Sequence, residues 1–289
     1  MRNNPAAFLA KDWLSGDGLR LSFRDYPGGQ PGRPALLCLH GLTRNARDFA
    51  PVAERFAGDW RMIVPDMRGR GQSEYAKDPS SYNLATYAED VARLLGELDC
   101  GPVIIVGTSM GGLIALHLAM TGAWPLAGVV LNDIGPQLEP AGLERIREYV
   151  GQGGSFETWM HAARHLREQF GKAHPDFAIA DWLVFAKQVM DLAGNGRIVF
   201  DYDMKIAEPL KAPDPTATDL WAAFRALRDT PTLLLRGELS DLLSAATVKA
   251  MKAALPQMKA VTVKRVGHAP TLAEPDALKA LADFLAEVE

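Results

Sequence analysis

The chain has 289 residues, of which 48% are hydrophobic and 23% are charged. This is the balance of a soluble globular protein that can bury a sizeable core, and it excludes disordered, collagen-like and coiled-coil chains. The 31 basic and 35 acidic residues give a net charge of −4, and no run of basic residues supplies the positive surface that nucleic-acid binding requires.

The sequence also argues against a membrane protein. No stretch approaches the roughly 18 uninterrupted apolar residues that a membrane helix needs. Residues 1–5 lack the apolar region of a signal peptide. The two cysteines, Cys38 and Cys100, lie at strand-like or apolar positions and are expected to be free thiols. We therefore expect a cytoplasmic protein, monomeric or homodimeric, without a membrane or nucleic-acid partner.

Short apolar runs alternate with helical patterns along the chain. Residues 8–15 and 19–26 flank a Gly-Asp-Gly turn and predict a β-hairpin. Six further runs predict strands: 34–39, 60–64, 102–106, 126–131, 230–235 and 260–266. Several of these runs are continuously apolar, as in parallel strands that helices cover on both faces.

Apolar residues at helical spacing lie between these runs. The predicted helices cover residues 49–56, 87–98, 110–119, 245–255 and 276–288. Alternating strands and helices predict an α/β fold with a mainly parallel sheet.

One region, residues 135–220, breaks this alternation and shows no convincing strand. Helix-like patterns cover residues 142–150, 156–170 and 180–190. Because ligands of open α/β sheets bind outside the carboxyl ends of the strands, this insertion is expected to form a lid there.

The strongest chemical signal is the G-x-S-x-G sequence from Gly107 to Gly111, with Ser109 at its centre. It follows a predicted strand and precedes a predicted helix, which is the setting of a nucleophile elbow. Glycines are needed there because side chains would collide with the sharply turned backbone. Ser109 is therefore the expected nucleophile.

Attack by a serine on an acyl group creates an oxyanion, which two backbone N–H groups usually hold. One comes from the residue after the nucleophile and the other from the loop after an earlier strand. Here these donors are expected to be Met110 and Leu42, the latter in the sequence Leu-His-Gly-Leu. His40 is expected to anchor that loop rather than to act as a base.

A serine hydroxyl also needs a base, and the base needs a carboxylate that fixes its tautomer. His268 follows the last predicted strand and is the expected base. Two aspartates follow strands and fit the chain order. Asp241 is preferred because the loop after the penultimate strand neighbours the histidine loop; Asp133 is the alternative, and Glu238 is a distant third.

A metal site is the competing interpretation of the other histidines. His161 and His165 have i, i+4 spacing, and His174 follows, but a third ligand is unclear and Ala162 replaces the glutamate of H-E-x-x-H. Neither a P-loop nor a dinucleotide-binding motif is present. We expect no metal and no cofactor.

Together these residues resemble the α/β-hydrolase superfamily over nearly the whole chain. The segments that carry the resemblance are 40–41, 66–73, 107–111, 237–241 and 267–268. The resemblance implies an eight-stranded, mostly parallel sheet flanked by helices, with a helical cap inserted after the sixth strand. The implied core covers residues 1–134 and 221–289, and the implied cap covers residues 135–220.

The resemblance also implies an activity that needs no metal or organic cofactor. Family dehalogenases and epoxide hydrolases carry aspartate at the elbow, where this chain has Ser109. Residues 41–45 lack the glycine-proline-glycine run of the carbon–carbon hydrolases. We therefore expect a serine esterase or lactonase that acts on a small or medium substrate. The alternatives are a carbon–carbon hydrolase of a vinylogous diketone and a small-molecule receptor on the same fold.

Overall fold

The computed structural model of the chain describes residues 6–211 and 219–288, so residues 1–5, on which the expectation about a signal peptide rests, lie outside it. An eight-stranded sheet has the order β1-β2-β4-β3-β5-β6-β10-β11. Its strands are β1 (Leu9–Leu14), β2 (Arg20–Tyr26), β3 (Ala35–Leu39), β4 (Met62–Pro65), β5 (Val103–Thr108), β6 (Leu126–Asn132), β10 (Thr232–Gly237) and β11 (Lys259–Val263). β2 runs antiparallel to both of its neighbours, β1 and β4, and the remaining strand pairs of this sheet are parallel. This confirms the predicted hairpin and the mostly parallel sheet.

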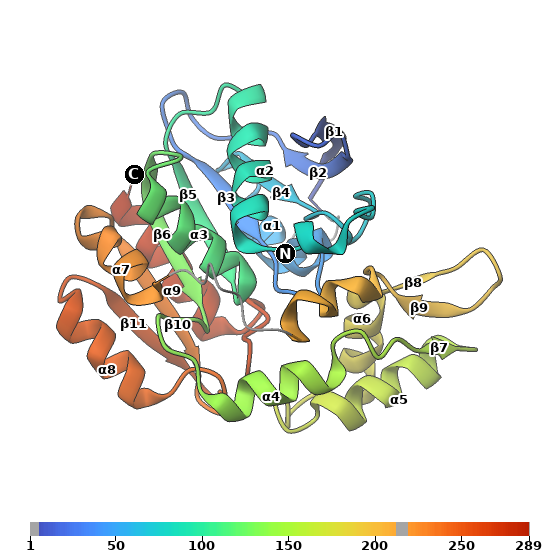
Figure 1. Cartoon of the computed structure of the whole chain (residues 1–289). Coiled ribbons are helices and arrows are strands. Elements are labelled where there is room, and N and C mark those ends of the chain that lie inside the picture. Colours follow the sequence, from blue (N-terminus) through green and yellow to red (C-terminus); the bar gives the residue numbers. More distant parts are fainter. Residues whose placement is uncertain (1–5, 212–218, 289) are drawn as a thin grey trace.

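Helices cover both faces of this sheet (Figure 1). On one face, α1 (Ala50–Phe56) and α9 (Pro275–Val288) pack against Leu36 and Cys38. The opposite face, with Leu37 and Leu39, is covered by α2 (Leu84–Glu97), α3 (Met110–Thr121), α7 (Leu220–Arg225) and α8 (Ala245–Ala254). Successive side chains of β3 point to opposite faces, so a strand buried on both sides is apolar throughout.

The segment between β6 and β10 holds three helices and a small antiparallel sheet of order β7-β9-β8. Its elements are α4 (Pro140–Tyr149), β7 (Ser155–Phe156), α5 (Trp159–Phe170), α6 (Ile179–Val189), β8 (Met190–Leu192) and β9 (Ile198–Phe200). The expectation of no strand in residues 135–220 was therefore wrong. Strands of two or three residues that pair only with each other are too short to show an alternating pattern.

This segment has its own apolar core, formed mainly by α5 and α6. Arg47 ties it to the rest of the chain, since its Nη2 lies 2.6 Å from Asp201 Oδ2 and its Nε donates to the Gln188 carbonyl at 2.9 Å. In Figure 1 it extends from one end of the sheet, with the β8–β9 hairpin projecting farthest. Residues 212–218 of the expected cap lie outside the description.

Short 3-10 helices complete the described elements: η1 (Ala46–Phe49), η2 (Pro79–Ser81), η3 (Met204–Ala207), η4 (Pro209–Lys211) and η5 (Ala226–Asp229). Within residues 6–211 and 219–288, no helix combines the length and the apolar character needed to cross a bilayer. Cys38 and Cys100 are both free thiols, as expected.

Candidate active site

Ser109 lies at the sharp turn between β5 and α3, where its backbone has φ 51° and ψ −113°. This conformation is rare for a residue with a side chain and is held by the surrounding packing. A Cβ atom at Gly107 would lie 2.6 Å from Gly111 C, and one at Gly111 would lie 2.1 Å from Leu39 O. Both glycines are therefore required by close backbone contacts, and the turn presents the Ser109 hydroxyl to a cavity.

A chain of two hydrogen bonds joins Ser109 to a buried carboxylate. His268 Nε2 lies 2.9 Å from Ser109 Oγ, and His268 Nδ1 lies 2.8 Å from Asp133 Oδ2. Because an ionised carboxylate only accepts, Nδ1–H is the donor to Asp133, and Nε2 is left to accept the Ser109 proton. This geometry suits proton transfer from the serine to the histidine.

The carboxylate of Asp133 is fully enclosed, with 0% of its side chain exposed. The Gly237 N–H donates to its Oδ1 at 2.9 Å, and the Ser240 hydroxyl donates to its Oδ2 at 2.6 Å. With the bond from His268, three donors compensate the loss of water around the charge. The carboxylate is thus held rigidly at the end of β6.

The structure corrects the prediction for the acid, because Asp241 does not contact His268. Its carboxylate instead receives two hydrogen bonds from Arg145 of α4, at 2.5 and 2.8 Å, and its side chain is 39% exposed. Burial raises the pKa of Asp241, but the hydrogen bonds and charge of Arg145 outweigh it, so the net shift is downward. Asp241 is therefore an ion-pair partner of α4. Glu238, the third acid considered, pairs with Lys264.

The reason for the correction lies in the path of the histidine loop. The loop after β10 does neighbour the loop after β11, as expected, but residues 268–272 fold back across β10 toward β6. Asn132 Nδ2 marks this path, since it donates to the Pro270 carbonyl at 2.9 Å and to Thr108 Oγ1 at 3.0 Å. Because β6 lies directly beside β5, the aspartate that follows Asn132 is close to the serine turn.

The two predicted oxyanion donors lie beside Ser109. Met110 is the first residue of α3, where the backbone N–H has no partner within the helix. The Leu42 N–H donates to no acceptor in the described part of the chain, and Leu42 lines the same cavity as Ser109. The helix N-terminus at Met110 also favours developing negative charge.

His40 is fully buried and fixes this loop, as expected. Its Nδ1–H donates to the Gly41 carbonyl at 2.7 Å, while its Nε2 accepts from the Met67 N–H at 3.0 Å. Burial, with a smaller contribution from the charges of Arg70 and Arg44, lowers the pKa of His40 to about 3. The ring therefore stays neutral and holds the peptide group that carries the Leu42 N–H.

The serine and histidine face a cavity of about 410 Å³ that lies between the sheet and helices α4, α5 and α6. Much of its wall is apolar, with Phe170, Phe185 and Val189 among the lining residues. Of the large apolar residues of α6, Phe185 and Val189 line this cavity. Trp182 and Trp159 instead pack into the apolar core of the α5–α6 segment.

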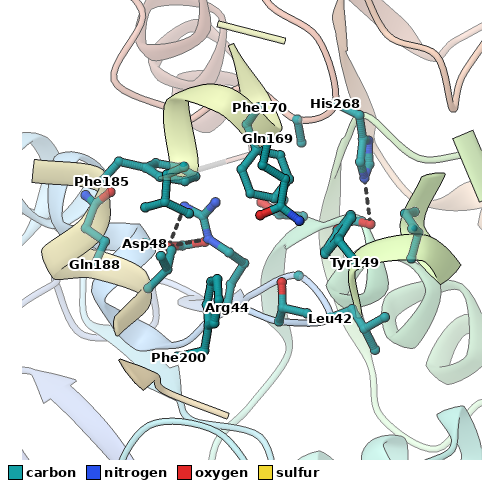
Figure 2. Close-up of a pocket in the computed structure, with 18 of the residues that line it drawn as sticks. Leu42, Arg44, Asp48, Tyr149, Gln169, Phe170, Phe185, Gln188, Phe200 and His268 are labelled. Carbon is teal, nitrogen blue, oxygen red and sulfur yellow. Dashed lines mark hydrogen bonds and ion pairs between the residues drawn. The ribbon is translucent and has the colours of Figure 1, made fainter. Parts of the chain in front are cut away.

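Polar side chains interrupt the apolar wall, among them Arg44, Asp48 and Gln169 (Figure 2). Arg44 Nε and Nη2 both donate to Asp48 Oδ1, at 3.0 and 2.8 Å, and the guanidinium lies 4.3 Å from the centroid of the Phe185 ring. Its Nη1 has no hydrogen-bond partner in residues 6–211 and 219–288. The buried Gln169 Oε1 likewise lacks a donor there, so the cavity offers hydrogen bonds to a ligand.

Two of the three histidines considered as metal ligands pack against aromatic rings. The ring of His165 packs at a tilt against Phe156, with 4.9 Å between the ring centroids, and His174 stacks against Phe177 at 4.6 Å. Among the described residues, no group of three or more His, Cys, Asp or Glu side chains is placed to hold a metal ion.

His174 predicts a pH dependence of stability. Burial, and then the charges of Arg44 and His268, lower the pKa of this 5% exposed ring to about 4. Between about pH 6.5 and pH 4 the unfolded chain binds a proton at His174 that the folded chain does not, so the free energy of unfolding falls as pH falls, by up to about 1.4 kcal/mol per pH unit. We expect His174→Phe to show a shallower pH dependence in urea unfolding at pH 7, 6 and 5.

The matched control is His161→Phe, on the exposed face of α5, which should leave the dependence unchanged. If the His174→Phe and wild-type proteins lost stability equally over this range, the assignment to His174 would be wrong.

Comparisons with known proteins agree with this architecture. A family model described as the alpha/beta hydrolase family matches residues 36–281. A crystal structure of an alpha/beta hydrolase from Novosphingobium aromaticivorans superimposes with a TM-score of 0.92 and 51% identity, over 98% of this chain and 99% of that one.

Two curated relatives carry more specific names. The chain is 35% identical over 268 residues to a 3-hydroxybutyrate-oligomer hydrolase of Cupriavidus necator, which covers 89% of each protein. It is 28% identical over 258 residues to a 2-(acetamidomethylene)succinate hydrolase of Mesorhizobium japonicum, covering 87% of this chain and 88% of that protein.

Proposed function

The chain belongs to the alpha/beta hydrolase family, and on that basis we propose that it is a serine hydrolase that cleaves a carboxylic ester or lactone. The observation that carries the proposal is the hydrogen-bonded chain from Ser109 Oγ through His268 to Asp133, which faces a partly apolar cavity. A serine with such a base becomes a nucleophile at neutral pH.

In this mechanism, Ser109 Oγ attacks the acyl carbonyl while His268 Nε2 accepts its proton. The Leu42 and Met110 N–H groups stabilise the oxyanion. The imidazolium of His268, stabilised by Asp133, then gives its proton to the leaving alcohol, and an acyl-enzyme remains on Ser109. Water repeats the attack with His268 again as the base, which releases the acid and restores the serine.

Residues 135–220 form the cap of the proposed enzyme, over a core of residues 1–134 and 221–289. Helices α4, α5 and α6 contribute one wall of the cavity, and the loops after β3, β5 and β11 contribute the other. In this arrangement the core supplies the reacting groups, and the cap selects the substrate.

The proposed substrate is an ester of a short hydroxy acid. The relative named 3-hydroxybutyrate-oligomer hydrolase supports this class. So do the unpartnered polar atoms in the cavity, because Gln169 Oε1 can accept a hydrogen bond from a substrate hydroxyl and Arg44 Nη1 can donate one to a second carbonyl. A plain alkanoyl chain would leave the buried Gln169 oxygen without a donor, which is unfavourable.

The test compares p-nitrophenyl butyrate with p-nitrophenyl 3-hydroxybutyrate, which differ by one hydroxyl group. We expect kcat/KM to favour the hydroxy ester by about three- to tenfold, the effect of one neutral hydrogen bond. Gln169→Leu should remove this preference without lowering the rate for the plain ester. Gln72→Leu, in the exposed loop after β4, makes the same change outside the cavity and is the control.

Failure of every ester and lactone in a folded preparation would contradict the proposal. Cleavage of a vinylogous diketone in their place would favour the carbon–carbon hydrolase. Tight binding of a ligand without turnover would favour a receptor. A preference for the hydroxy ester that survives Gln169→Leu would leave the serine mechanism intact and contradict the role of Gln169.

A further inference from the structure

We infer that Arg70 is a positioning residue that holds both halves of the oxyanion hole and places an uncompensated positive charge behind it. The inference rests on the proposed serine mechanism, since it concerns the site where that reaction places negative charge. It assigns a chemical role to one arginine of residues 66–73, a segment that the sequence marks only as part of the family resemblance.

One guanidinium contacts both residues that supply the oxyanion donors. Arg70 Nε donates to the Leu42 carbonyl at 2.9 Å, and Arg70 Nη2 lies 3.8 Å from the Met110 sulfur. Leu42 is on the loop after β3, and Met110 begins α3. Arg70 therefore joins the peptide group of Leu42 and the side chain of Met110 through a single rigid, planar group.

His40 and Arg70 together restrain both peptide groups that flank Leu42. His40 holds the Gly41 carbonyl, and Arg70 holds the Leu42 carbonyl. With both carbonyl oxygens bound, neither peptide plane can rotate freely. The Leu42 N–H, which has no acceptor in the described part of the chain, is therefore left pointing in one direction.

The guanidinium is itself held in place. Arg70 Nη1 donates to the Arg68 carbonyl at 2.7 Å and to the Tyr87 hydroxyl at 2.9 Å. The rings of Tyr82 and Tyr87 lie 5.5 and 5.1 Å from its central carbon. Its side chain, 0% exposed, is packed on every side. A charge held this rigidly needs no rearrangement when the oxyanion forms.

The charge of Arg70 is the second part of the inference, and Arg68, two residues earlier, provides the comparison. Arg68 is equally buried, but Asp90 and Asp17 form ion pairs with it at 2.7 and 2.9 Å. Arg70 has no ion pair with any residue in the described ranges, and its acceptors are carbonyls, a hydroxyl and a sulfur.

A buried cation without a carboxylate is costly to fold, because its water is lost and no opposite charge replaces it. The same charge in a low-dielectric site strongly favours an anion that forms nearby. The arrangement thus costs stability in the resting protein and lowers the energy of the tetrahedral intermediate.

The test uses Arg70→Met, which keeps the length of the side chain and removes its charge and donors. We expect kcat for p-nitrophenyl butyrate to fall by about 100-fold, within the range for loss of one oxyanion donor, while KM changes less than threefold. Affinity for an alkyl boronic acid, which forms a tetrahedral adduct with the serine, should fall in parallel with kcat/KM. Arg70→Lys should recover part of the loss, because it restores the charge but not the several fixed donors of the guanidinium.

Ser73→Ala is the matched control in the same 66–73 loop. It removes the hydrogen bonds that the buried Ser73 hydroxyl makes with the Ser22 N–H and the Asp66 carbonyl, and it leaves the side-chain contacts of Arg70 in place, so it should lower the Tm and leave kcat within threefold of the wild type. A fall in kcat as large as that of Arg70→Met would show that any loosening of this region slows the reaction, and would overturn the inference.

Should Arg70→Met fail to fold, Met110→Leu decides the question, since it removes only the contact between Arg70 and the sulfur at nearly constant volume. Boronate affinity should then fall severalfold at unchanged KM. Unchanged boronate affinity in Arg70→Met, or in Met110→Leu if that variant is needed, would overturn the role of Arg70 and leave the proposed function standing. A wild-type protein that neither hydrolyses the ester nor binds the boronate would overturn the proposed function as well.

Discussion

Ser109→Ala is expected to lower kcat for p-nitrophenyl butyrate by about 10⁶-fold, because loss of the nucleophile removes the covalent route entirely. The substitution deletes one oxygen atom and its hydrogen bond with His268, at 2.9 Å, and nothing else. Alanine has the same difficulty as serine at φ 51°, so the turn should keep its conformation. The Tm should therefore stay close to that of the wild type.

The measurement is the initial rate of p-nitrophenol release at enzyme concentrations high enough to detect the residual rate. Ser80→Ala, on the exposed η2 turn, is the control for the same change elsewhere and should have full activity. A residual activity in Ser109→Ala above about 1% would mean that another group attacks the ester.

Asp133→Asn should lower kcat by about 10⁴-fold, whereas Asp241→Asn should change it by less than tenfold. The amide that replaces the carboxylate of Asp133 can donate to Nδ1, which would place the imidazole proton on Nε2, and Nε2 could then no longer accept the proton of Ser109. Asp241 lies against Arg145 instead, so its loss removes a partly exposed ion pair without touching the histidine.

The two aspartate variants are measured side by side, with kcat, KM and Tm for each. Because Asp133 also accepts from Gly237 and Ser240, its substitution should lower the Tm as well. Ser240→Ala separates the two effects: it removes one bond to Asp133 and should lower the Tm with a much smaller fall in kcat. If Asp241→Asn were the more damaging aspartate substitution, the assignment from the structure would be wrong.

Much of this architecture could be predicted from short-range patterns. The apolar runs mark six strands of the large sheet, since strands buried on both faces need apolar residues throughout. The Gly-Asp-Gly turn marks β1 and β2, and the helical spacings mark α1, α2, α3, α8 and α9 but not the short α7. Ser109 and His268, which form a hydrogen bond in the structure, could be singled out because each sits in a recognisable local setting. Ser109 lies in a strand-turn-helix, and His268 lies in a loop after a strand.

The carboxylate that contacts His268 could not be predicted because its position depends on the path of a loop. Asp133 and Asp241 both follow strands, and no local pattern states that residues 268–272 turn back toward β6. Asn132 gave a hint of this path, because it is a polar residue at the end of a buried strand and can form a hydrogen bond with an incoming loop. The residues that line the cavity could not be predicted either. Trp182 and Phe185 lie three residues apart on one amphipathic helix, yet of these two only Phe185 lines the cavity.

The central claim, an acyl-enzyme on Ser109, is tested most directly by mass spectrometry. The protein is mixed with excess p-nitrophenyl 3-hydroxybutyrate, quenched in acid within the first turnover, digested and mapped. The account predicts one hydroxybutyryl group on the peptide that contains Ser109, formed with the first burst of p-nitrophenol and absent from Ser109→Ala. Steady turnover with no adduct on that peptide, or an adduct on any other residue that forms at the same rate, would contradict it.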